Sequence, residues 1–114
     1  MGGVNKPEVP TVAVDAVPAD ASPLDVREAD EWAAGHAPTA QHIPMSQIQT
    51  RLDEISADQD PLYVICRSGG RSGQVVGFLV EKGYPAVNVS GGMQAWFAAG
   101  RPVEADGPGP ATII

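Results

Sequence analysis

The sequence predicts an α/β fold with three layers, in which helices cover both faces of a parallel sheet. Two observations lead to this prediction. Short apolar segments that suit buried strands alternate along the chain with segments whose apolar residues have helical spacing. One strand segment, residues 62–65, is a continuous apolar run, which is typical of a strand buried on both faces of a parallel sheet.

The first half of the chain begins with two predicted strands, residues 11–14 and 24–26, joined by a brief turn or helix over residues 15–20. Residues 28–34 are rich in helix formers, carry acids in the first turn and are followed by Gly35. Acids favour the positive end of a helix dipole and glycine favours the end of a helix, so this segment is predicted as a short helix.

Residues 42–43 form a short extended segment that is bounded by a proline. In residues 46–55, Ile48, Leu52 and Ile55 recur at helical spacing, which predicts a second helix.

The second half of the chain repeats the alternation. The buried strand 62–65 is followed by a helix over residues 71–82, a strand over 86–89 and a helix over 93–99. Helical crossovers between strands imply a parallel sheet, and ligands bind beyond the carboxyl ends of such strands. Cys66, directly after the buried strand, has that position.

Length and charge limit the kind of protein. A chain of 114 residues suits one domain, which we place at residues 11–103, between a flexible N-terminus of residues 1–10 and a flexible Gly/Pro-containing tail of residues 104–114. The formal net charge of −7 argues against binding to nucleic acid or to an acidic membrane surface. We expect a monomer.

The chain shows no apolar run near the roughly 20 residues that span a bilayer, and its first residues lack the apolar stretch of a signal peptide. The cytoplasm is therefore the expected location. A single cysteine excludes an internal disulfide, and one thiol with two histidines argues against a zinc site. We expect neither a metal nor a cofactor.

The loop after the buried strand carries the predicted chemistry. It consists of Cys66, Arg67, Ser68, Gly69, Gly70, Arg71 and Ser72. Its glycines permit a tight curl in which backbone N–H groups point inward, and the start of the next helix adds a positive dipole end. Together with the two arginines, these groups favour a thiolate at Cys66 and an anionic ligand beside it.

In three segments the sequence resembles the rhodanese family of single-domain sulfurtransferases. They are Leu24-Asp25-Val26-Arg27-Glu28 with Gly35-His36 following, the loop Cys66 to Ser72, and Gly91-Gly92-Met93-Gln94-Ala95-Trp96. The resemblance covers residues 11–103, and the loop is its most specific part. It implies a central parallel sheet of five strands and a loop that cradles the transferred sulfur through its backbone amides.

The function that the resemblance implies is that of a thiosulfate sulfurtransferase. Cys66 would be the catalytic nucleophile and would hold the sulfur as a persulfide, and the loop residues Arg67, Ser68, Gly69, Gly70, Arg71 and Ser72 would bind the substrate. The partners would be a small anionic sulfur donor, such as thiosulfate, and an acceptor such as cyanide or a thiol, with a protein as a further kind of acceptor.

Two alternatives stay open. One is a persulfide carrier or partner-docking module that does not turn over. The other is a cysteine-based phosphatase, because the same architecture supports a related loop in dual-specificity phosphatases. Four residues separate Cys66 from Arg71, whereas the phosphatase loops have five, and the shorter loop favours sulfur over phosphate.

Several other residues that could carry chemistry are interpreted as structural. They are the pair Asp25 and Arg27, the histidines His36 and His42, and the aromatic residues Trp32, Trp96 and Phe97, which are expected in the core.

Overall fold

The structure is a computed structural model that describes residues 9–56 and 58–114. Its five strands are β1 (Thr11–Val12), β2 (Leu24–Asp25), β3 (Gln41–His42), β4 (Leu62–Ile65) and β5 (Ala86–Val89). Its helices are α1 (Ala29–Ala34), α2 (Gly70–Glu81) and α3 (Gly92–Ala98), with 3-10 turns η1 (Val14–Ala16), η2 (Met45–Gln47) and η3 (Leu52–Glu54). The order of elements confirms the predicted alternation of strands and helices.

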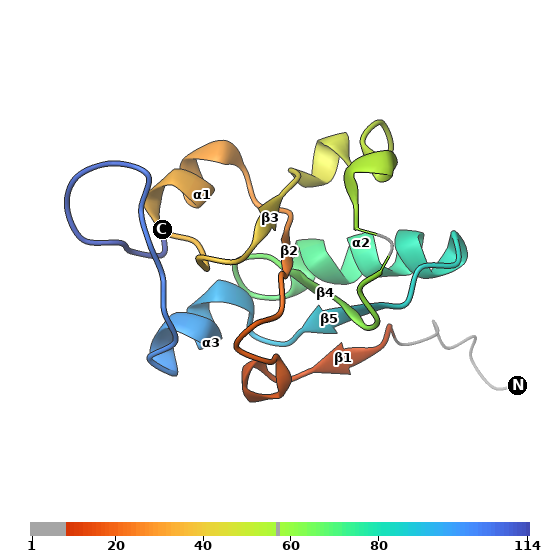
Figure 1. Ribbon diagram of the computed structural model, residues 1–114, viewed down its shortest axis with the longest axis horizontal. Coiled ribbons are helices and arrows are strands. Elements are labelled where there is room, and N and C mark those ends of the chain that lie inside the picture. The colour runs from red at the N-terminus through yellow and green to blue at the C-terminus, as the bar shows by residue number, and fades with distance from the viewer. Residues whose placement is uncertain (1–8, 57) are drawn as a thin grey trace, which may run out of the picture.

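All five strands are parallel and lie in the order β1-β5-β4-β2-β3 (Figure 1). β4 is central, and its register pairs Leu62 with Ala86 of β5 and Val64 with Leu24 of β2. This arrangement confirms the predicted parallel sheet of five strands. It also means that the loop after β4 leaves the middle of the sheet.

Alternate side chains of β4 enter two separate parts of the core, as the two-residue period of a strand requires. Leu62 and Val64 pack in the cluster that includes the buried residues of α2, whereas Tyr63 and Ile65 pack with those of α3. The sheet is therefore covered on both faces, which confirms the three layers and explains why the β4 segment is apolar throughout.

The predicted helix over residues 46–55 is wrong, since η2 and η3 occupy this segment instead. Arg51 leaves helical geometry with φ −123° and ψ 23°, and the backbone makes two separate turns. Ile48 and Ile55 are nevertheless 3% and 5% exposed. Two short turns bury the same apolar positions as one helix would, so spacing alone could not distinguish them.

The segment after α3 runs back along α1, at the end of the molecule where α1 and α3 lie (Figure 1). Glu104 and His36 exchange two backbone hydrogen bonds of 2.8 and 2.9 Å, and the amides of Asp106 and Thr112 donate to carbonyls at the end of α1. Ile113 packs against the core cluster that contains Tyr63 and Trp96. The flexibility that the sequence predicts for residues 104–114 stays a prediction.

Within residues 9–56 and 58–114, no helix is both long and apolar enough to cross a membrane.

Candidate active site

Cys66 is the first residue of the loop that joins β4 to α2. Its side chain is in the core, with the residue 1% exposed. The Gly69 N–H donates to Cys66 Sγ at 3.1 Å, and the Ser72 hydroxyl lies 3.2 Å from the same sulfur. Gly69 has a φ of 112°, a left-handed conformation that glycine adopts without steric cost, so this residue can turn its amide inward.

Helix α3 holds the loop from the other side. The carbonyl oxygens of Cys66 and Arg67 accept hydrogen bonds from the amides of Met93 and Gln94, at 2.8 and 3.0 Å. Gly92 makes this approach possible, since a Cβ atom at this residue would lie 2.6 Å from the Arg67 oxygen and would also clash with the Cys66 oxygen. The Gly-Gly segment of the sequence thus brings the start of α3 against the backbone of the loop.

The environment of Cys66 favours the thiolate. Burial raises the pKa of the thiol, but hydrogen bonds from the Ser72 hydroxyl and from the backbone amides of Ser72, Gly69 and Ser68 oppose it. The net result is a pKa below its ordinary value. The lowered pKa was expected from the sequence, although the hydrogen bonds, rather than two arginine charges, account for it here.

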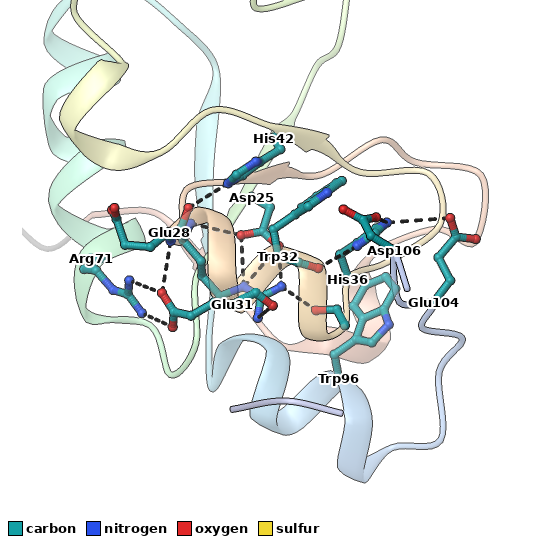
Figure 2. A network of polar contacts seen from close by, with 12 residues as sticks. Asp25, Glu28, Glu31, Trp32, His36, His42, Arg71, Trp96, Glu104 and Asp106 are labelled. Atoms are coloured by element: carbon teal, nitrogen blue, oxygen red, sulfur yellow. Dashed lines mark hydrogen bonds and ion pairs between the residues drawn. The ribbon is translucent and has the colours of Figure 1, made fainter. Parts of the chain in front are cut away.

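Arg71 is held by Glu31 of α1. Its two terminal nitrogens donate to the two Glu31 oxygens at 2.7 and 2.8 Å, and Figure 2 shows the guanidinium and the carboxylate facing each other. Glu31 Oε1 also accepts from the amide of Glu28, which completes a capping box at the start of α1. Hydrogen bonding to Arg71 lowers the pKa of Glu31 to about 2, against its burial. Arg71 therefore fastens the loop to α1.

Arg67 lies on the exposed side of the loop. Its Nε donates to the carbonyl oxygen of Ile114 at 2.9 Å. With the Gln94 amide turned so that its oxygen faces the guanidinium, Gln94 accepts from the two terminal nitrogens at 3.3 and 3.1 Å. Of the two loop arginines, Arg67 is thus the more exposed, and the final residues of the chain contact it.

The other loop residues predicted to bind substrate differ in burial. Ser68 and Gly70 are exposed, whereas Ser72 is fully buried. Ser72 lies between Cys66 and the Asn88 side chain, with its Oγ 2.6 Å from Asn88 Oδ1. The structure therefore brings Ser72 to the sulfur and places the other two at the outer surface of the loop.

Asp25 and Arg27 form a fully buried ion pair, with 2.8 Å between Arg27 Nη2 and Asp25 Oδ2. Arg27 also donates to the carbonyl oxygens of Glu31 and Gly35 at 3.2 and 2.7 Å. The pair joins the end of β2 to the middle and the carboxyl end of α1, which is the structural role that the sequence suggested for it.

The two histidines lie on either side of Trp32, with ring centroids 3.7 Å away for His36 and 4.7 Å for His42 (Figure 2). His36 Nδ1 bonds the Trp32 carbonyl, and His42 Nε2 bonds the Arg27 carbonyl. Among the residues that the structure describes, no group of His, Cys, Asp and Glu side chains is arranged to hold a metal ion.

The aromatic residues differ from one another. Trp96 is in the core, as expected, at 4% exposure, and its indole N–H donates to the Pro102 carbonyl. Trp32 is half-buried. The prediction for Phe97 is wrong, because it is 47% exposed. Met93 and Trp96 take the face of α3 that meets the core, and Phe97 follows Trp96 around the helix toward solvent.

Sequence reasoning missed two residues of the site, Glu31 and Asn88. Glu31 stands three residues after Glu28, a spacing that suits a capping box, but nothing in the sequence connects it to Arg71, 40 positions later. Asn88 is 8% exposed in β5, and a polar residue inside an apolar strand was the one available signal.

A surface hollow of about 400 Å³ lies away from Cys66, between α2 and the turn η2. Its lining residues are Met45, Ser46, Ile48, Gln49, Gln74, Val75 and Phe78. None of them is an acid, a base or a thiol.

Comparison with known proteins agrees with this fold. Residues 13–99 match a family model described as the rhodanese-like domain. The chain is 43% identical over 79 residues to YtwF of Bacillus subtilis, covering 69% of this chain and 76% of YtwF. It is 41% identical over 83 residues to a sulfurtransferase of Allochromatium vinosum, covering 72% of this chain and 77% of the relative. A thiosulfate sulfurtransferase from Pseudomonas aeruginosa superposes with a TM-score of 0.75 at 25% identity, covering 87% of this chain and 21% of that one.

Proposed function

Because this chain belongs to the rhodanese-like domain family, we propose that it is a sulfurtransferase that carries a sulfur atom as a persulfide on Cys66. The observation that carries the proposal is the pair of contacts to Cys66 Sγ, from the Gly69 amide and the Ser72 hydroxyl. They favour a thiolate, which is the nucleophilic form of cysteine.

In the first half-reaction, the Cys66 thiolate attacks the outer sulfur of a donor such as thiosulfate. A bond forms between Sγ and that sulfur, the bond from the outer sulfur to the sulfite sulfur breaks, and sulfite leaves with the electron pair. Inward-facing amides such as that of Gly69 would then stabilise the negative charge on the persulfide. A relative with a solved structure is named as a thiosulfate sulfurtransferase, which supports this choice of donor.

In the second half-reaction, a thiolate or cyanide attacks the outer sulfur, the bond to Sγ breaks, and the Cys66 thiolate is restored. The two steps predict ping-pong kinetics. Arg67 is the loop arginine proposed to attract the anionic donor, since Arg71 is paired with Glu31 while Arg67 is exposed. A donor that approaches Arg67 would compete with its contact to the Ile114 carbonyl.

The test is mass spectrometry of the intact chain after treatment with thiosulfate, followed by a thiocyanate assay with cyanide. We expect the chain to gain one sulfur, to lose it on addition of cyanide, and to gain none as Cys66→Ser. A Cys66→Ser variant that releases sulfite as fast as the unaltered chain would refute the mechanism.

The same experiment separates the alternative functions. A stable gain of sulfur that cyanide does not remove would indicate a persulfide carrier that requires a protein acceptor. Turnover of a phenyl phosphate without sulfur transfer would indicate a phosphatase.

A further inference from the structure

The hydroxyl of Ser72 lies between two groups that compete for its hydrogen. Its Oγ is 3.2 Å from Cys66 Sγ and 2.6 Å from Asn88 Oδ1, and both Ser72 and Cys66 are buried. A serine hydroxyl has one hydrogen, so it donates to one of these two neighbours at a time.

The Asn88 amide has a fixed orientation. Its Nδ2 donates to the carbonyl oxygen of Gly69 at 3.2 Å, which leaves Oδ1 to face Ser72. Turning the amide around would place Oδ1 against the Gly69 oxygen, with two acceptors facing each other. Asn88 therefore acts toward Ser72 as an acceptor only.

The protonation of Cys66 decides which neighbour receives the hydrogen. When Cys66 is a thiol, its S–H can donate to Ser72 Oγ while Ser72 donates to Asn88, and every group is satisfied. When Cys66 is a thiolate, Ser72 must donate to the sulfur, and the Asn88 oxygen loses its donor. A buried acceptor without a donor destabilises that state.

We propose that Asn88 is a positioning residue that acts through Ser72 to set the protonation of Cys66, stabilising the neutral thiol relative to the free thiolate. The same competition extends to the persulfide and there rests on the proposed function. In the persulfide, Sγ is bonded to the outer sulfur, which carries the negative charge, so Ser72 is free to donate to Asn88 again. Asn88 thus disfavours the empty thiolate relative to the sulfur-loaded form.

We call the hydrogen bonds that connect Cys66 through Ser72 to Asn88 the relay. The charged groups around the loop are separate from this relay. Arg71 at the start of α2 is paired with Glu31 of α1, and Arg67 lies at the exposed side of the loop. A neutral substitution of Asn88 in β5 leaves these charges unchanged. Its effect on Cys66 therefore reports on hydrogen bonding.

Cys66 is the one cysteine of the chain, so the ultraviolet absorbance of its thiolate can be titrated directly. We expect Asn88→Ala to lower the titration midpoint by roughly half to one pH unit, because the Ser72 hydroxyl can then donate its hydrogen bond to the thiolate without leaving a buried acceptor unpaired. Ser72→Ala should raise the midpoint. In the Ser72→Ala background, Asn88→Ala should have no further effect, because the relay is already absent.

A purely structural role of Asn88 predicts the opposite. Losing its bond to Gly69 would loosen the loop, weaken the Gly69 N–H contact to Sγ, and raise the midpoint with or without Ser72. A rise, an unchanged midpoint, or an equal shift in the Ser72→Ala background would each overturn the proposal. Asn88→Leu keeps the branched shape of the side chain without the amide, and must shift the midpoint in the same direction as Asn88→Ala.

The titration needs no sulfur donor, so it fails or succeeds independently of the proposed function. If the midpoint shifts as expected but the chain takes no sulfur from thiosulfate, the relay is supported and the proposed sulfurtransferase function is refuted. If the chain forms the persulfide but the midpoint does not shift, the proposed function is supported and the relay is refuted.

Discussion

At the scale of single residues, Gly92 is where the loop and α3 approach most closely. Its φ is +55°, and an added Cβ would lie 2.6 Å from the Arg67 oxygen and against the Cys66 oxygen. Both atoms belong to the backbone and cannot turn aside. We expect Gly92→Ala to lower the free energy of unfolding by at least about 2 kcal/mol, combining strain with overpacking. Chemical denaturation measures this.

The matched control is Gly77→Ala. Gly77 lies inside α2, where an added Cβ meets only the Val9 side chain at an ordinary 3.7 Å. Because alanine is the better helix former by about 1 kcal/mol, this change should leave the chain as stable or more so. If the two variants were equally stable, the close contact between α3 and the loop would not exist.

At the scale of elements, the ion pair between Glu31 and Arg71 connects α1 to the start of α2. The pKa of Glu31 is lowered from an ordinary 4.5 to about 2, so its ionised form stabilises the folded chain. This stabilisation is complete above pH 4.5 and is lost as the pH falls through the interval down to about 2. Glu31→Gln should therefore flatten the pH dependence of unfolding in that interval.

Glu54→Gln is the control for this prediction. Glu54 is paired with Arg51 at 2.7 Å, but its side chain is 46% exposed, and exposed pairs contribute little to stability. We expect its unfolding free energy to follow that of the unaltered chain across the acid range. An identical acid response of both variants would mean that the pair between Glu31 and Arg71 does not hold the loop.

The elements also show what sequence patterns can and cannot predict. The helix of residues 71–82 was predicted within one residue of α2, because its apolar stripe faces a single core cluster that includes Val75, Val76 and Leu79. The segment of residues 46–55 has the same kind of spacing but lies in two short turns. Spacing identifies which residues are buried, and it does not identify the backbone that buries them.

The site shows a similar division. The loop from Cys66 to Ser72 was predicted because its residues are consecutive and their backbone geometry is local. The contacts that adjust it come from distant parts of the chain, with Glu31 from α1 and Asn88 from β5. Such pairs depend on the order of strands in the sheet, which is set by packing of the whole domain and not by any nearby pattern.

At the scale of the whole molecule, the final residues lie against α1 and reach the loop at Arg67. Gly35 permits this, because an added Cβ would clash with the Thr112 oxygen and lie 3.0 Å from its nitrogen, while its φ of 175° suits any residue. Gly35→Ala should displace the segment without straining its own backbone, and the Thr112 amide should then lose protection from hydrogen exchange. Gly107→Ala, whose Cβ meets nothing within 4 Å, should keep that protection. Equal exchange at Thr112 in the two variants and the unaltered chain would show that this segment is the flexible tail that its composition predicts.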